Sequence, residues 1–209
     1  MSARVIAAVL LAACALRAIA AESSDAAMQR ADQVMRESFS GATAEQWRTG
    51  LAQDEAQRLC SRYHDLPPPA IGEKIAAEAH ASMRYPQSGK LIGDWREGEK
   101  LASTVAGGRI STIQPEPADR KHGGNCYACH ALAPKEMAAG DLGPSLTRYG
   151  RLRGNSHETI KLVYEKIYNT QATFPCSPMP RFGHNGWLTP EQIADAVAFL
   201  LDPESPVNK

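Results

Sequence analysis

The sequence predicts an all-α fold, and three observations support this prediction. Helix-start signals recur along the chain, each placing a capping residue just before a periodic apolar segment. The apolar residues of those segments recur at the i, i+3, i+4, i+7 spacing of an amphipathic helix. Prolines separate the segments, and a proline cannot continue a helix that precedes it.

Composition limits the possible functions. The chain has 209 residues, which allow one or two domains with a buried core. Lys and Arg together number 23, and Asp and Glu also number 23. A surface that binds nucleic acid normally shows a basic excess, so we exclude nucleic acid as a partner. Any charged partner is expected to meet a local patch.

Residues 1–20 are predicted to be a signal peptide. Arg4 precedes a short apolar run, and Ala18-Ile19-Ala20 matches the A-x-A cleavage pattern. The run is too short to span a bilayer, so we expect a periplasmic protein without a transmembrane segment. Two alternatives stay open: a buried core helix, and lipid anchoring at Cys14, which ends a sequence that resembles a lipoprotein processing box. Export implies an oxidising compartment.

The strongest motif is Cys126-Tyr127-Ala128-Cys129-His130, the C-x-x-C-H pattern of haem c attachment. Thiols at this spacing can reach two vinyl groups of one porphyrin, and the histidine then lies under the iron. A thioredoxin-like pair would need a βαβ context, and a zinc site would need a second cysteine pair. We therefore predict one covalently bound haem c, with His130 as a metal ligand.

Met179 is the predicted second iron ligand. Pro178 and Pro180 flank it and restrict the backbone on either side. Met137 is too close to His130 in sequence for the chain to pass round the porphyrin rim. A core-filling role for Met179 remains an alternative, as do His157 and His184 as imidazole ligands.

Flanking segments are expected to support this site. The carbonyl of Pro144 is predicted to accept the N–H of the other ring nitrogen of His130, although an ordinary Gly-Pro turn is the alternative. A helix over residues 93–102 contains Gly98, which costs about 1 kcal/mol inside a helix and so predicts a close helix crossing.

Two further helices are predicted in the second half of the chain. Ser156 opens one whose apolar face can cover the haem. Thr189 and Gln192 form a capping box that opens the last helix, with Pro190 at its first position. The apolar residues of the earlier helix are Ile160, Val163, Tyr164 and Ile167.

The order of these motifs resembles a class I cytochrome c domain, and the motifs themselves are similar to the SoxX family. They are GGNCYACH, GDLGPSL, PMPRFG and the ending QIADAVAFLLDPESPVNK. SoxX is the monohaem subunit of the SoxAX complex, an L-cysteine S-thiosulfotransferase that joins thiosulfate oxidatively to a cysteine of SoxY in the SoxYZ carrier. The resemblance implies haem attachment through Cys126, Cys129 and His130, with Met179 as the distal ligand.

The resemblance also implies partners and a role. It implies a SoxA-type partner subunit, transient contact with the SoxYZ carrier and electron transfer to a downstream c-type cytochrome. The subunit itself would have no catalytic residues. A free periplasmic electron shuttle and a haem enzyme of the peroxidase kind are the competing functions. A thioether on the sixth iron position would leave no place for peroxide.

The predicted domains are the signal peptide at 1–20, a helical N-terminal extension at 21–87 and the haem domain at 88–209. In the extension, three apolar stripes predict three helices, the second of which follows a capping box at Thr43 and Gln46. The stripes are Met28, Ala31 and Met35; Ala52, Ala56, Leu59 and Tyr63; and Ile71, Ile75 and Ala79.

Cys60 and Cys176 are the remaining cysteines of the mature chain, and we predict that they form a disulfide. On the chain-entropy model, so long a closed loop would stabilise the fold by about 4 to 5 kcal/mol. Copper or another metal held by Cys60 and His64 is the alternative.

Four arginines are expected to pair with haem propionates or to meet an acidic redox partner. A solvated loop is the alternative for several of them. They are Arg148, Arg151, Arg153 and Arg181.

Overall fold

In the computed structural model, the described residues are 25–104, 122–134 and 138–209, and helices are the only regular secondary structure among them. This confirms the all-α prediction. None of the described helices is both long enough and apolar enough to span a membrane. The predicted signal peptide, Cys14 and Met137 lie outside the described residues.

The chain divides into two compact units, Met1–Leu66 and Pro67–Lys209. The predicted boundary between the extension and the haem domain, at residues 87 and 88, falls inside the second unit. The reason is helix α4 (Pro69–Ala81), which packs against the short helical turn η3 (Thr170–Ala172) of the second unit. The extent of each functional domain stays a prediction.

The first unit is helical but more interrupted than expected. Residues 25–38 form a helix, and Thr43 and Gln46 form the predicted capping box at the start of α2 (Ala44–Gln46). The expectation that this helix continues to Tyr63 is wrong. A π-helical turn at Trp47–Leu51 ends it, and α3 (Glu55–Arg62) starts anew, because Asp54 adopts an extended backbone and forms a second capping box with Gln57.

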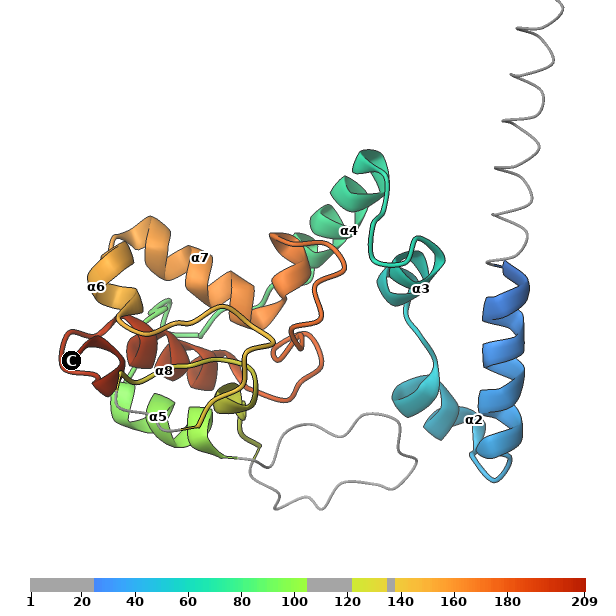
Figure 1. Cartoon of the computed structure of the whole chain (residues 1–209), viewed down its shortest axis with the longest axis horizontal. Helices are drawn as coiled ribbons and strands as arrows, with labels where there is room; N and C mark the ends of the chain where they lie inside the picture. The colour runs from blue at the N-terminus through green and yellow to red at the C-terminus, as the bar shows by residue number, and fades with distance from the viewer. Residues whose placement is uncertain (1–24, 105–121, 135–137) are drawn as a thin grey trace, which may run out of the picture. The chain divides into compact units, whose positions relative to one another are not determined.

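The second unit contains the helices that were predicted around the haem motif (Figure 1). Ser156 caps α7 (His157–Tyr168), and Thr189 and Gln192 form the predicted capping box of α8 (Pro190–Leu201). The same unit contains α5 (Trp95–Ser103), α6 (Tyr149–Arg153) and the short turns η2 (Cys126–Ala128) and η4 (Pro206–Asn208).

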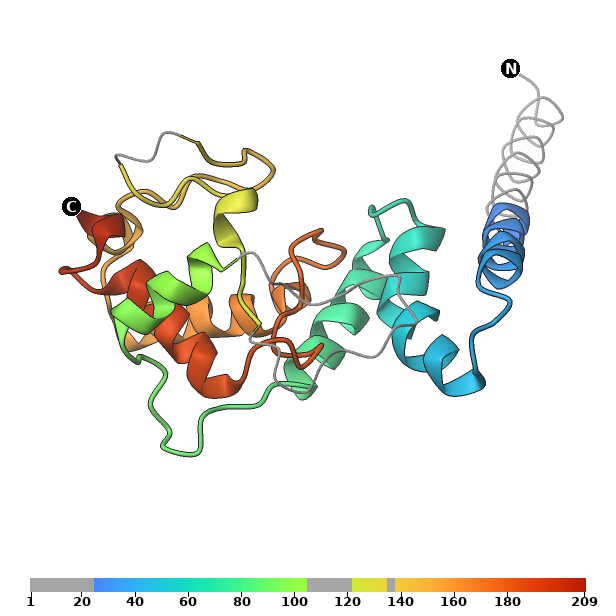
Figure 2. The same ribbon diagram turned by 90° about the horizontal axis from the view of Figure 1, so that it is seen from below.

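Helices α5 and α8 cross closely, as Figures 1 and 2 both show. A Cβ atom added at Gly98 would lie 2.1 Å from the carbonyl oxygen of Asp195 and 2.8 Å from Cβ of Phe199. The Gly93 N–H donates to the carbonyl of Ala194 at 2.9 Å, so the segment before α5 is tied to the same helix. The close crossing predicted from Gly98 is therefore confirmed.

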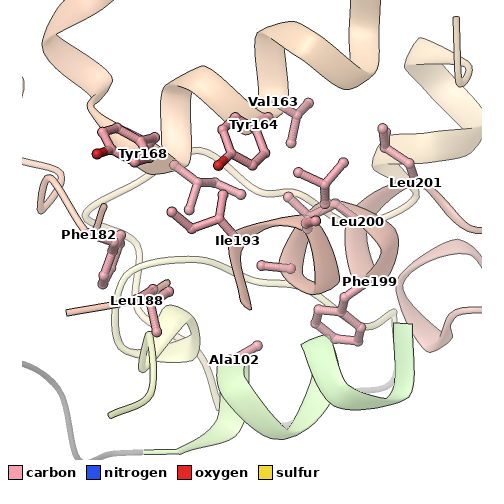
Figure 3. Packing of buried hydrophobic residues seen from close by; sticks show 14 of the residues in the cluster. Ala102, Val163, Tyr164, Tyr168, Phe182, Leu188, Ile193, Phe199, Leu200 and Leu201 are labelled. Atoms are coloured by element: carbon pink, nitrogen blue, oxygen red, sulfur yellow. The ribbon is translucent and has the colours of Figure 1, made fainter. Parts of the chain in front are cut away.

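The core of the second unit lies on both sides of α8, against α7 on one side and α5 on the other (Figure 3). Of the predicted stripe on α7, Val163, Tyr164 and Ile167 are buried, whereas Ile160 is partly buried. Each large apolar side chain buried in this way stabilises the fold by roughly 1.5 to 3 kcal/mol. This buried core therefore holds in place the helices to which the surrounding loops are attached.

The C-terminal tail is anchored by polar side chains that the sequence analysis missed. The amide of Asn208 donates to the carbonyls of Leu200 and Asp202, at 3.1 and 2.8 Å, and its oxygen accepts the Arg151 N–H at 3.1 Å. The Asn208 side chain thus satisfies two carbonyl groups at the C-terminal end of α8 and binds the backbone of α6. The hydroxyl of Ser205 donates to the carbonyl of Phe199.

Candidate haem site

The C-x-x-C-H segment forms a tight turn that is held by α5. Asn125 precedes it in the left-handed backbone region, at φ 45°, a conformation that asparagine tolerates better than most residues. The N–H groups of Gly124 and Asn125 donate to the carbonyls of Leu101 and Thr104, at 2.8 and 3.1 Å. The carbonyls at the end of α5 are thereby used to fix the start of the motif.

The His130 ring is held by the loop that follows it. Nδ1 of His130 lies 2.7 Å from the carbonyl oxygen of Pro144, which is the hydrogen bond predicted from the sequence. Because Nδ1 is used in this way, Nε2 is the nitrogen that can bind iron. The Gly143 N–H donates to the carbonyl of Cys129 at 2.8 Å and draws the loop onto the motif.

Two glycines allow this close approach. A Cβ atom at Gly143 would lie 2.2 Å from Cε1 of His130, and one at Gly140 would lie 1.9 Å from the carbonyl oxygen of Ala128. Side chains at either position would push the loop away from the motif. The GDLGPSL motif was noted in the sequence, but only the structure explains its glycines.

The two motif cysteines are free thiols and half-buried. Burial raises the pKa of Cys126 to about 11. A thioredoxin-like cysteine is reactive because its pKa is lowered, so the environment of Cys126 does not fit that alternative.

The Met179 loop is supported by the end of α7. The N–H groups of Gly183 and His184 both donate to the carbonyl of Tyr168, at 3.0 and 3.1 Å. Gly183 lies against the Tyr168 ring, where a Cβ atom would come within 2.2 Å of Cδ2. Met179 itself is partly buried and packs against the core.

The competing histidines lie at the surface. His157 is the exposed first residue of α7, and His184 is exposed with Nδ1 at 3.4 Å from the Ser82 hydroxyl. The four arginines differ in their exposure. Arg148, Arg151 and Arg153 are exposed, whereas Arg181, two residues after Met179, is only 9% exposed.

Cys60 and Cys176 are each disulfide-bonded. Cys60 therefore has no thiolate to offer a metal, and the copper alternative with His64 is not supported. The pairing of Cys60 with Cys176 stays a prediction.

The motif residues fit a haem c. Two free thiols stand at the required spacing, and a histidine presents Nε2 because its other nitrogen is held by a carbonyl. Gly140 and Gly143 lack side chains at the two points where the loop touches the motif backbone and the His130 ring. When bound, a haem supplies an iron that gains and loses a single electron.

The fold and this site define a cytochrome c domain, and the comparisons with known proteins agree. The cytochrome c family matches residues 118–202 of this chain. Such domains carry a covalently bound haem c and belong to the electron-transfer class.

One relative resembles most of the chain. It is an uncharacterized lipoprotein of Aquifex aeolicus (strain VF5), which is 44% identical over 168 residues. The match covers 79% of this chain and 78% of the relative. The chain therefore belongs to the same protein family as that lipoprotein, with a cytochrome c domain in its C-terminal half.

Proposed function

We propose that this protein is a monohaem electron-transfer cytochrome c of the SoxX type. In this role it accepts the electrons released when thiosulfate is joined to the SoxY cysteine, and it passes them to another c-type cytochrome. The observation that carries the proposal is the His130 ring, whose Nδ1 is held by the Pro144 carbonyl so that Nε2 is available to iron. The SoxX-like motifs supply the specific pathway.

Cys126 and Cys129 are proposed to attach the haem, with His130 and Met179 as its axial ligands. Met179 is favoured because it lies in a loop that packs on the core, whereas His157 and His184 are exposed. A thioether ligand raises the reduction potential and closes the sixth coordination position. Both effects suit electron transfer better than peroxide chemistry.

Catalysis on sulfur is proposed to need a SoxA-type partner. Within the described residues, Cys60 and Cys176 are disulfide-bonded, and the two other thiols belong to the haem motif. This leaves no described cysteine as a nucleophile for a sulfur substrate. The isolated protein should therefore not turn over thiosulfate.

The Aquifex aeolicus relative is named a lipoprotein, which favours an exported protein. We therefore propose that this chain is anchored to lipid at Cys14. A tethered cytochrome would stay at the membrane surface, which disfavours the free-shuttle alternative. Co-expression with a SoxA-type subunit separates the two functions. Stable co-purification supports the complex, and a protein that elutes alone supports the shuttle.

The ligand assignment is tested by the substitution Met179→Ala. We expect the variant to lose the Met-to-iron charge-transfer band of the ferric protein and to show a lower reduction potential, because sulfur no longer binds the iron. Absorption spectroscopy and redox titration measure both. Met35→Ala, in the helix of residues 25–38, is the matched control and should change neither the charge-transfer band nor the reduction potential. A charge-transfer band that persists in Met179→Ala would refute the assignment.

A further inference from the structure

The outward side of α7 carries a surface that mixes cationic and apolar side chains. We call it the α7 outer surface, and it consists of Arg153, Leu162, Lys166 and Phe174. Leu162 and Lys166 lie one helical turn apart on α7. The Lys166 ammonium lies 4.5 Å from the centre of the Phe174 ring. Arg153 is the exposed last residue of α6.

The two apolar side chains of this surface are exposed to solvent, although large apolar side chains are usually buried. Leu162 is 42% exposed and Phe174 is 58% exposed, although α7 buries Val163, Tyr164 and Ile167 from the same turns. Burying such side chains against a partner would gain the free energy that the isolated unit leaves unused.

Positive charge on this surface is not neutralised. Neither Arg153 nor Lys166 forms an ion pair with a carboxylate among the described residues. The Glu165 carboxylate is 6% exposed and already bound by Lys161 and Tyr85, so its charge is used inside the fold. Glu158, at the start of α7, is exposed and supplies one negative charge nearby. Burial and the charge of Arg153 both lower the pKa of Lys166.

We propose that the α7 outer surface docks a protein partner whose contact surface combines carboxylates with apolar residues. This inference rests on the proposed function, in which the protein works beside other redox subunits. Carboxylates near Arg153 and Lys166 would relieve the repulsion between these cations, and apolar residues would cover Leu162 and Phe174.

An anionic membrane surface is the competing occupant, and the packing of α7 disfavours it. A helix that binds a membrane surface buries a continuous apolar face in the lipid. The apolar face of α7 is already buried in the core, so only isolated apolar side chains remain outside.

The experiment titrates the reduced, isotope-labelled holoprotein with a short peptide that combines glutamates and leucines, followed by nuclear magnetic resonance. We expect saturable shifts of backbone amides in residues 153–174. In the double variant Arg153→Glu, Lys166→Glu, the dissociation constant should rise by about tenfold or more, as two lost charge contacts predict. Lys90→Glu is the matched control, because Lys90 is exposed in the same unit and makes no ion pair among the described residues. It should leave the dissociation constant unchanged.

The proposal is overturned if the peptide does not bind, if the shifts map elsewhere, or if both variants weaken binding equally. It is also overturned if the double variant weakens binding to phosphatidylglycerol vesicles but does not weaken binding to the peptide. The absorption spectrum separates this proposal from the function proposed above. Failure to bind with the Met-to-iron band intact refutes docking alone, whereas a missing band with normal binding refutes the ligand assignment alone.

Discussion

His130 shows how single residues prepare the site. Its ring is held on one edge by the Pro144 carbonyl and is packed against Gly143, where no side chain would fit. A histidine held in this way loses little conformational freedom when it binds iron, and its tautomer is already selected. The conformational entropy of the His130 ring is therefore lost during folding and not when iron binds.

Glu165 is a buried carboxylate that is held by two neighbouring side chains, Lys161 and Tyr85. Burial opposes its ionisation, but hydrogen bonds from Lys161 and Tyr85 outweigh burial and hold its pKa below the ordinary value of 4.5. The hydroxyl of Tyr85 donates to this carboxylate at 2.6 Å. A carboxyl group whose pKa is lowered by folding stabilises the protein above its unfolded-state pKa, and this contribution is lost as the pH falls through the folded-state pKa.

We therefore predict that Glu165→Gln reduces the loss of stability on acidification. The unfolding free energy of the natural protein should fall as the pH drops below 4.5, and the variant should show a shallower decrease. Denaturant titrations at a series of pH values measure this slope. Glu158→Gln, an exposed residue on the same helix, is the control and should keep the original slope. Equal slopes for the two variants would contradict the role given to Glu165.

Among the elements, the crossing of α5 and α8 is the contact most sensitive to side-chain size. Gly98 allows α5 to rest directly on the backbone of α8 at Asp195. The haem motif is bonded to the end of α5 through Leu101 and Thr104. A displacement of α5 would therefore reach the haem cysteines.

We predict opposite effects for alanine at two helical glycines. Gly98→Ala should destabilise the protein by about 1 to 3 kcal/mol, because its methyl group would overlap the Asp195 carbonyl. Gly72→Ala in α4 should stabilise it by about 0.5 to 1 kcal/mol, because its nearest neighbour would be Pro175 at 3.7 Å and alanine favours the helix. Thermal unfolding of the holoprotein compares them. A Gly98→Ala variant as stable as Gly72→Ala would disprove the close crossing.

For the molecule as a whole, the cysteines determine the covalent framework. Two are disulfide-bonded, and two free thiols lie in the haem motif. Once haem is attached, none of these four should remain as a thiol. The haem and the disulfide would then constrain different parts of the chain.

Mass spectrometry of the mature holoprotein tests this framework. We expect the mass of one haem and no alkylation before reduction, because all four thiols are used. After reduction, two alkyl groups should be added, at Cys60 and Cys176, while Cys126 and Cys129 stay bonded to haem. Peptide mapping should find Cys60 linked to Cys176. Two reactive thiols in the oxidised protein would rule out the predicted bridge.

Local patterns were enough to predict helices α4, α5, α7 and α8 of the second unit and the residues of its C-x-x-C-H motif, whereas α6 was not predicted. The caps at Ser156 and Thr189 and the stripe on α7 depend on neighbours within one or two turns, so the chain itself carries that information. The glycine of α5 could be interpreted for the same reason, because its cost in a helix is local.

Contacts between distant segments could not be obtained in this way. The capping box of Asp54 and Gln57 is a local signal that the sequence carries. The anchoring of α6 and α8 by Asn208, in contrast, joins residues far apart in sequence. The burial of Arg181 and the exposure of Phe174 likewise depend on which segments pack together. The residues proposed to bind haem, and the Pro144 carbonyl that holds His130, were therefore predicted from the sequence. The anchoring by Asn208 and the surface left open on α7 follow from long-range packing, which no local pattern encodes.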